Sequence, residues 1–270
     1  MTLSRGSRLV LGVVVAVVMT FIYVPLLVVI ASSFNTSKTF TWPIEGFTTY
    51  WWTQVLDSPG FKGALLTSVQ VGLAATAIAL VLGSLLSFAV ARYHWFGRDA
   101  ISFLVVLPIA LPGIVTGVAL QNAFVNFHPF GIGLGLAAVV IGHATFCIVV
   151  VYNNVVARLR RSSVSFEEAS MDLGATTFQT FRHITFPATR SAIAAGALLA
   201  FGLSFDEIIV TQFTAGAGVQ TLPIWIFQNL ARPNQAPVVN VVAAILIIVA
   251  IIPVWLTNRL AGDTAGGGRL

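Results

Sequence analysis

The sequence predicts an all-α membrane protein with six transmembrane helices, and three observations support this fold class. Of the 270 residues, 57% are hydrophobic and only 9% are charged, whereas a soluble domain carries about a quarter charged residues. The apolar residues form six stretches of about 20 residues or more, the length that crosses a bilayer core. These stretches are too long for membrane-barrel strands, so helices are expected to pair the backbone in lipid.

The six stretches are predicted to form one transmembrane domain over residues 1–270. The first follows Arg5 and Arg8 but is longer than the apolar region of a cleaved signal peptide, so we expect an uncleaved anchor. The third contains Pro108, Pro112 and Gly113, which should kink or break its helix. A Gly-rich tail at 261–270 is expected to be flexible. The predicted spans are 9–31, 65–90, 101–126, 134–156, 190–214 and 238–257.

The basic residues predict the orientation of these spans. If both termini are cytoplasmic, only Lys38, Lys62 and Arg232 of the 14 basic residues lie outside, as the positive-inside rule requires. The net charge of +5 is therefore spread over membrane boundaries, and a basic patch for nucleic acid is excluded. The long outer loop, about 32–64, is aromatic and predicts a helix near Thr48–Leu56. This helix could lie at the membrane interface or contact an external partner.

The longest inner loop, residues 157–189, is predicted to fold into two short helices. Ser165 and Glu168 have the spacing of a capping box, in which each side chain bonds the other residue's backbone N–H. Gly174 should end the first helix in the left-handed conformation, and Thr176 should begin the second. The pair could rest on lipid headgroups, or it could present a docking helix to a soluble partner.

The fifth predicted span contains Asp206 and Glu207, the two acidic residues that lie well inside a predicted span. Charged side chains in a membrane cost several kcal/mol unless they face a cavity or a partner, so a substrate pathway is the first hypothesis. Their position in the outer half also allows them to reach the outer headgroups. Ser204, Glu207 and Thr211 share one helix face, which favours Glu207 towards water and Asp206 towards another helix or a partner permease. A role for Asp206 in the pathway stays open.

The inner loop resembles the EAA loop of ATP-binding-cassette (ABC) importer permeases. Glu168-Ala169-Ser170, Gly174 and the segment Ile184–Pro187 follow the spacing E-A-A-x3-G-x9-I-x-L-P, with Ser170 and Phe186 as substitutions. Most of the chain, including Ser33–Ser37 and Phe201–Glu207, is similar to the permeases of spermidine/putrescine importers.

The resemblance implies half of a type I importer in a bacterial inner membrane. A second permease subunit would complete the pathway, two copies of a P-loop ATPase would bind beneath it, and an external substrate-binding protein would deliver substrate. The loop residues implied in ATPase coupling are Ser165, Glu167, Glu168, Ala169, Ser170, Gly174, Ile184 and Pro187. The residues predicted for the substrate pathway are Ser204, Phe205, Asp206, Glu207, Thr211, Phe213 and Trp225.

Carboxylates beside aromatic rings suit the ammonium groups of a polyamine, so a polyamine is the expected substrate. Related permeases carry iron, thiamine or phosphonates, and import of such a solute is the alternative. A stand-alone carrier or channel is a further alternative. The sequence lacks G-x-x-x-x-G-K-[ST], G-x-S-x-G and H-E-x-x-H, so we expect no catalytic residues and no cofactor or metal, with ATP and Mg bound by the ATPase. The single cysteine, Cys147, is expected to be a packed apolar residue.

Overall fold

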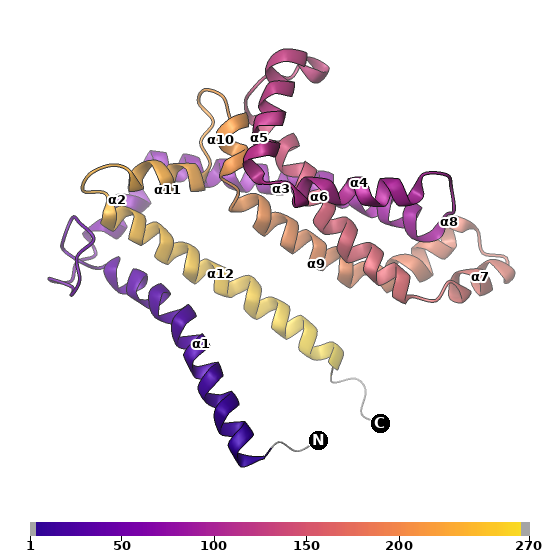
Figure 1. Ribbon diagram of the computed structural model, residues 1–270, viewed down its shortest axis with the longest axis horizontal. Coiled ribbons are helices and arrows are strands. Elements are labelled where there is room, and N and C mark those ends of the chain that lie inside the picture. The colour runs from indigo at the N-terminus through magenta and orange to yellow at the C-terminus, as the bar shows by residue number, and fades with distance from the viewer. Residues whose placement is uncertain (1–3, 266–270) are drawn as a thin grey trace. The chain divides into compact units, whose positions relative to one another are not determined.

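The computed structural model describes residues 4–265. Helices and the loops between them make up this part of the chain, with one isolated antiparallel bridge, Asn35 to Phe47. The helices fall into two compact units, one made of the residues up to Lys62 with those from Ile226, the other of Gly63–Trp225. Figure 1 shows each helix by label. In chain order the elements are α1 (Arg5–Ser32), α2 (Tyr50–Asp57), α3 (Pro59–Arg92), α4 (Arg98–Ala110), α5 (Gly113–Asn122), η1 (Ala123–Phe127), η2 (Pro129–Gly131), α6 (Leu136–Arg161), α7 (Ser165–Asp172), α8 (Thr177–Thr180), η3 (Phe181–Thr185), α9 (Phe186–Phe205), α10 (Ile209–Thr214), α11 (Leu222–Leu230) and α12 (Ala236–Ala265).

The described helices confirm the all-α membrane fold. Among residues 4–265, four helices are long and apolar enough to cross a membrane: α1, α3, α6 and the continuous helix Thr177–Phe205. The pair α4 and α5 would make a fifth span. The apolar segment Ala236–Ile251 of α12 is shorter, so the count of six spans stays a prediction.

The third predicted span is broken where its prolines lie. The helical segments Arg98–Ala110 and Gly113–Phe127 are bent by 103°, because Leu111 before Pro112 adopts an extended conformation (ψ 145°). The predicted break is confirmed. Beyond it, α5 packs closely on α10, since a Cβ at Gly117 would lie only 2.5 Å from Cδ2 of Phe213.

The core of the second unit lies along α6, which packs against α9 (Figure 1). Cys147 is buried there with Ala79 and Ala200, and its Sγ lies 3.3 Å from the Ala200 carbonyl O. The prediction that Cys147 is a packed apolar residue is confirmed.

In the first unit, α12 packs against α1 and α2. The helix predicted near Thr48–Leu56 is confirmed as α2, and its place at the membrane interface stays a prediction. Its Trp51 donates an indole hydrogen bond to the Asn35 carbonyl O (3.1 Å), which ties the helix to the loop before it. Of the predicted flexible tail, residues 261–265 continue α12. The rest, 266–270, lies outside the described residues.

Candidate functional site

The loop between α6 and α9 folds locally as two short helices, α7 and α8. Gly174 has φ +87° and ends α7 in the left-handed conformation that the sequence predicts. Thr176 begins α8 with a complete capping box. The Thr176 N–H donates to Gln179 Oε1 at 2.8 Å, and the Gln179 N–H donates to Thr176 Oγ1 at 3.3 Å.

The capping box predicted at Ser165 and Glu168 is wrong. Ser165 is already the first helical residue, and the preceding Val164 occupies the cap position without a side-chain hydrogen bond. The Ser165 hydroxyl instead contacts the hydroxyl of Ser163. The helix starts one residue too early for the Ser165 side chain to reach the N–H groups that a capping box would satisfy.

An ion pair holds α7 against the ends of two long helices. The Arg92 guanidinium, at the last residue of α3, donates from Nε to both Glu167 carboxylate oxygens at 3.0 Å, and its Nη2 lies 2.9 Å from Glu167 Oε1. Its Nη1 donates to the Leu159 carbonyl O of α6 at 3.2 Å. Because the Arg92 and Glu167 side chains are only 11% and 14% exposed, α7 is attached to α3 and α6 by a largely desolvated contact.

An open groove of about 610 Å³ lies along α7 and the start of the next helix. Its walls combine apolar and small residues, and two of the apolar side chains are strongly exposed, Leu173 at 90% and Phe166 at 68%. Exposed apolar surface of this kind beside polar groups marks an interaction site. The groove is lined by Phe166, Ala169, Ser170, Leu173, Gly174, Ala175, Gln179, His183 and Ile184.

The predicted coupling residues are distributed around this groove. Ala169, Ser170, Gly174 and Ile184 line it, and the Ser170 hydroxyl lies 3.2 Å from that of Thr180, joining α7 to α8. The others lie nearby on the same segment. Glu167 pairs with Arg92, Glu168 is exposed, Ser165 begins α7 and Pro187 lies in the first turn of α9.

The predicted fifth span is interrupted at its acidic residues. Helix α9 ends at Phe205 and α10 begins at Ile209, with Asp206 and Glu207 in the break. Glu207 Oε1 accepts a hydrogen bond from the Val210 N–H at 2.9 Å, which satisfies a free donor at the start of α10.

The continuous helix face expected at the two acidic residues is interrupted by the break. Asp206 is exposed in this chain, and Glu207 is partly buried and caps α10. Which of the two faces the pathway, and which faces another helix or the partner permease, stays a prediction. Ser204 and Thr211 are buried and hydrogen-bond His143 of α6 rather than facing water.

The three aromatic residues predicted beside the acidic pair pack against protein. The Phe205 ring centroid lies 5.8 Å from that of Phe201. Phe213 packs on Gly117, and Trp225 is buried. The exposed carboxylate of Asp206 is thus the polar group that the break presents most openly.

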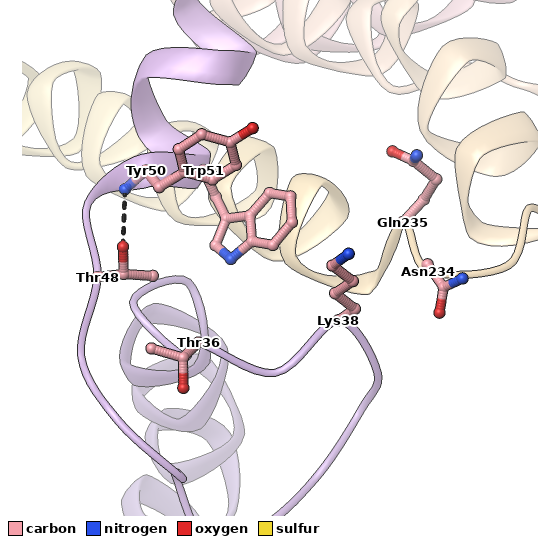
Figure 2. A pocket seen from close by; sticks show the side chains of 7 residues that line it. All are labelled: Thr36, Lys38, Thr48, Tyr50, Trp51, Asn234 and Gln235. Atoms are coloured by element: carbon pink, nitrogen blue, oxygen red, sulfur yellow. Dashed lines mark hydrogen bonds between the residues drawn. The ribbon is translucent and has the colours of Figure 1, made fainter.

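A second pocket, of about 490 Å³, lies in the first unit beside α2. Figure 2 shows Lys38 between Trp51 and the amide side chains of Asn234 and Gln235. The Tyr50 N–H donates to Thr48 Oγ1 at 3.1 Å, which shapes one wall. With an exposed ammonium and several amide and hydroxyl groups, the pocket suits an anionic group. Its lining residues are Thr36, Lys38, Thr48, Tyr50, Trp51, Asn234 and Gln235.

Residues 79–264, which include the broken span and the groove, match the family of binding-protein-dependent transport system inner membrane components. The chain belongs to this family and is a multi-pass membrane subunit of such a system.

Individual members of this family are similar to the chain over most of its length. The chain is 32% identical over 263 residues to the spermidine/putrescine transport system permease protein PotC of Shigella flexneri, covering 97% of this chain and 98% of that protein. It is 34% identical over 233 residues to the putrescine transport system permease protein PotI of Escherichia coli (strain K12), covering 84% and 82%. The crystal structure of a bacterial ABC transporter involved in the import of the acidic polysaccharide alginate matches with a TM-score of 0.69 at 17% identity, over 95% of this chain and 99% of the other. The ABC importer permease fold is confirmed.

Replacing Gly174 by valine should weaken the structure of the groove. A Cβ at this position would meet no atom within 4 Å, so the cost is backbone strain at φ +87°, about 1–3 kcal/mol. If the groove docks a separate ATPase subunit, Gly174→Val should reduce the amount of that ATPase that co-purifies with the chain several-fold. Gly174→Asn, which tolerates the left-handed conformation, is the matched control and should retain it. Equal ATPase recovery from both variants would show that the turn is not needed for docking.

Proposed function

We propose that this chain is one of the two membrane subunits of an ATP-driven importer for polyamines such as spermidine and putrescine. The observation that carries this proposal is the similarity to PotC along 97% of the chain. The exposed Asp206 in a helix break agrees with a cationic substrate, since a carboxylate attracts ammonium groups and would repel sulfate or a phosphonate. ATP hydrolysis takes place in a separate subunit.

In this proposal the groove along α7 receives the ATPase on the cytoplasmic side, where both termini also lie. Leu173 and Phe166 supply apolar area that the partner would cover. The Arg92–Glu167 ion pair passes the movement of α7 directly to the end of α3. A lipid-resting loop would have no need of this rigid attachment, so the contact favours docking over a purely interfacial role.

The pocket beside α2 would face the external binding protein. We expect its Lys38 ammonium to meet a carboxylate of that protein. Lys38→Glu should slow association about threefold and weaken its salt dependence, because rim charges act mainly on the association rate. The matched control is Lys62→Glu, an exposed residue of the same charge that does not line the pocket. Association rates are measured by surface binding of the external protein to the purified complex, and equal rates for both variants would contradict this role.

Co-purification tests the subunit composition. A tagged chain extracted from its native membrane in a mild detergent should bring a P-loop ATPase and a second permease in stable amounts. A stand-alone carrier would instead be recovered alone and would still transport. Recovery without either partner, from a preparation that transports substrate, would overturn the proposal.

A further inference from the structure

His143 of α6 lies fully buried between the two helices on either side of the break. Its Nδ1 is 2.8 Å from Ser204 Oγ, in the last turn of α9, and its Nε2 is 2.8 Å from Thr211 Oγ1, in the first turn of α10. The Thr211 hydroxyl also donates to the Glu207 carbonyl O at 3.0 Å. One side chain from a neighbouring helix therefore connects both ends of the broken span.

The hydrogen bonds define how the imidazole is protonated. Thr211 has a single hydroxyl proton, and it is donated to the Glu207 carbonyl, so Thr211 Oγ1 accepts from His143 Nε2–H. In a neutral imidazole, the form that full burial favours, His143 Nδ1 then accepts from the Ser204 hydroxyl. With this assignment three hydrogen bonds run in one direction from Ser204 to the backbone of Glu207.

A helix break inside a membrane leaves backbone groups that water cannot reach, and they must be paired within the protein. Here the Glu207 carboxylate pairs the Val210 N–H, and the chain from His143 pairs the Glu207 carbonyl. The side-chain carboxylate and the backbone carbonyl of Glu207 are both hydrogen-bonded, and this also determines the position of the adjacent Asp206 carboxylate.

We propose that His143 is a positioning residue. Its hydrogen bonds to Ser204 and Thr211 hold the ends of α9 and α10 together across the break and so place the carboxylates of Asp206 and Glu207 for substrate. We call this set of hydrogen bonds the clasp. This inference rests on the proposed function in its use of the two carboxylates. The clasp itself is a property of the helix break and is testable without transport.

The transport-independent test uses a reporter cysteine. Because Cys147 is the single cysteine of the chain, Cys147→Ala with Val210→Cys leaves one thiol, buried at the start of α10 beside the break. In membrane vesicles, adding His143→Phe should raise the rate of labelling by a maleimide about tenfold, since buried partners lose their hydrogen bonds. His143→Gln keeps one donor and one acceptor and should restore the slower rate. An unchanged rate in His143→Phe would overturn the clasp.

A transport assay tests whether His143 positions the two carboxylates for substrate. At equal protein in the membrane, His143→Phe should raise the KM for spermidine about tenfold, whereas Cys147→Ala, one turn along α6 and equally buried, should match the parent chain. In a double-mutant cycle, His143→Phe with Glu207→Gln should be no worse than the more severe single variant to within about twofold. Effects that multiply would overturn the positioning of Glu207.

Labelling and transport together distinguish a failure of the His143 clasp from a failure of the proposed polyamine import. Faster labelling in His143→Phe together with an absence of polyamine uptake by the parent complex would contradict the proposed function and leave the clasp standing. If His143→Phe does not accumulate, Ser204→Ala removes one hydrogen bond of the same chain and should raise the labelling rate about threefold. No change in that variant would equally overturn the clasp.

Discussion

Exchanging Arg92 for glutamate is expected to reduce ATP-driven transport about a hundredfold. The change places two carboxylates together in a contact where the native side chains are 11% and 14% exposed. Breaking a desolvated ion pair costs on the order of 3 kcal/mol, which corresponds to about a hundredfold loss of the docked position of α7. Uptake by the assembled complex should fall by about that factor, because in the proposed mechanism α7 would no longer transmit movement to α3.

Two variants distinguish this effect from a general charge effect. The exchanged pair, Arg92→Glu with Glu167→Arg, restores opposite charges and should recover a large part of the uptake. Arg160→Glu makes the same charge change at an exposed position near the end of α6 and should leave uptake close to that of the parent. If the exchanged pair is as defective as Arg92→Glu alone, the ion pair is not what holds α7.

Removing the two negative charges in the helix break should have the second largest effect. Glu207→Gln keeps an oxygen that can accept the Val210 N–H, and Asp206→Asn changes an exposed group, so the fold should survive both. Each loses attraction for the ammonium groups of a polyamine, and charged hydrogen bonds contribute about 1.5–3 kcal/mol. We expect the spermidine KM to rise about tenfold for each and further for both together.

This prediction is measured as initial uptake of labelled spermidine at matched expression. Glu45→Gln removes an exposed acidic charge from the first outer loop and is the control for a general loss of negative charge. Unchanged uptake in the double variant Asp206→Asn with Glu207→Gln would mean that these carboxylates lie off the substrate pathway.

Features set by neighbouring residues could be predicted from the sequence. The left-handed turn at Gly174 and the break at Pro112 follow from the backbone preferences of single residues, and both are present. The sequence also predicts a second helix from Thr176, which caps α8 and forms a capping box with Gln179 three residues on. The box at Ser165 failed because a shift of one residue in the helix start changes every capping partner.

Features that depend on residues far apart in the chain could not be predicted. Arg92 and Glu167 are 75 residues apart, and the sequence shows Arg92 only as one of the basic residues at a membrane boundary. His143 is 61 residues from Ser204, so its role depends on the packing of α6 against α9. No proline lies near the break at Asp206. The apolar stretch around it is long enough for one continuous span, so the sequence does not predict a break there.

Reconstitution in proteoliposomes can show whether this chain forms half of an ATP-driven polyamine importer. The complex is purified through the tagged chain, its external binding protein is placed on the side opposite the ATPase, and uptake of labelled spermidine is followed. We expect uptake that requires ATP, the binding protein and the ATPase together, and that fails when the ATPase is removed. Uptake by the chain alone without ATP, or an ATP-dependent complex that imports another solute and ignores spermidine and putrescine, would contradict it.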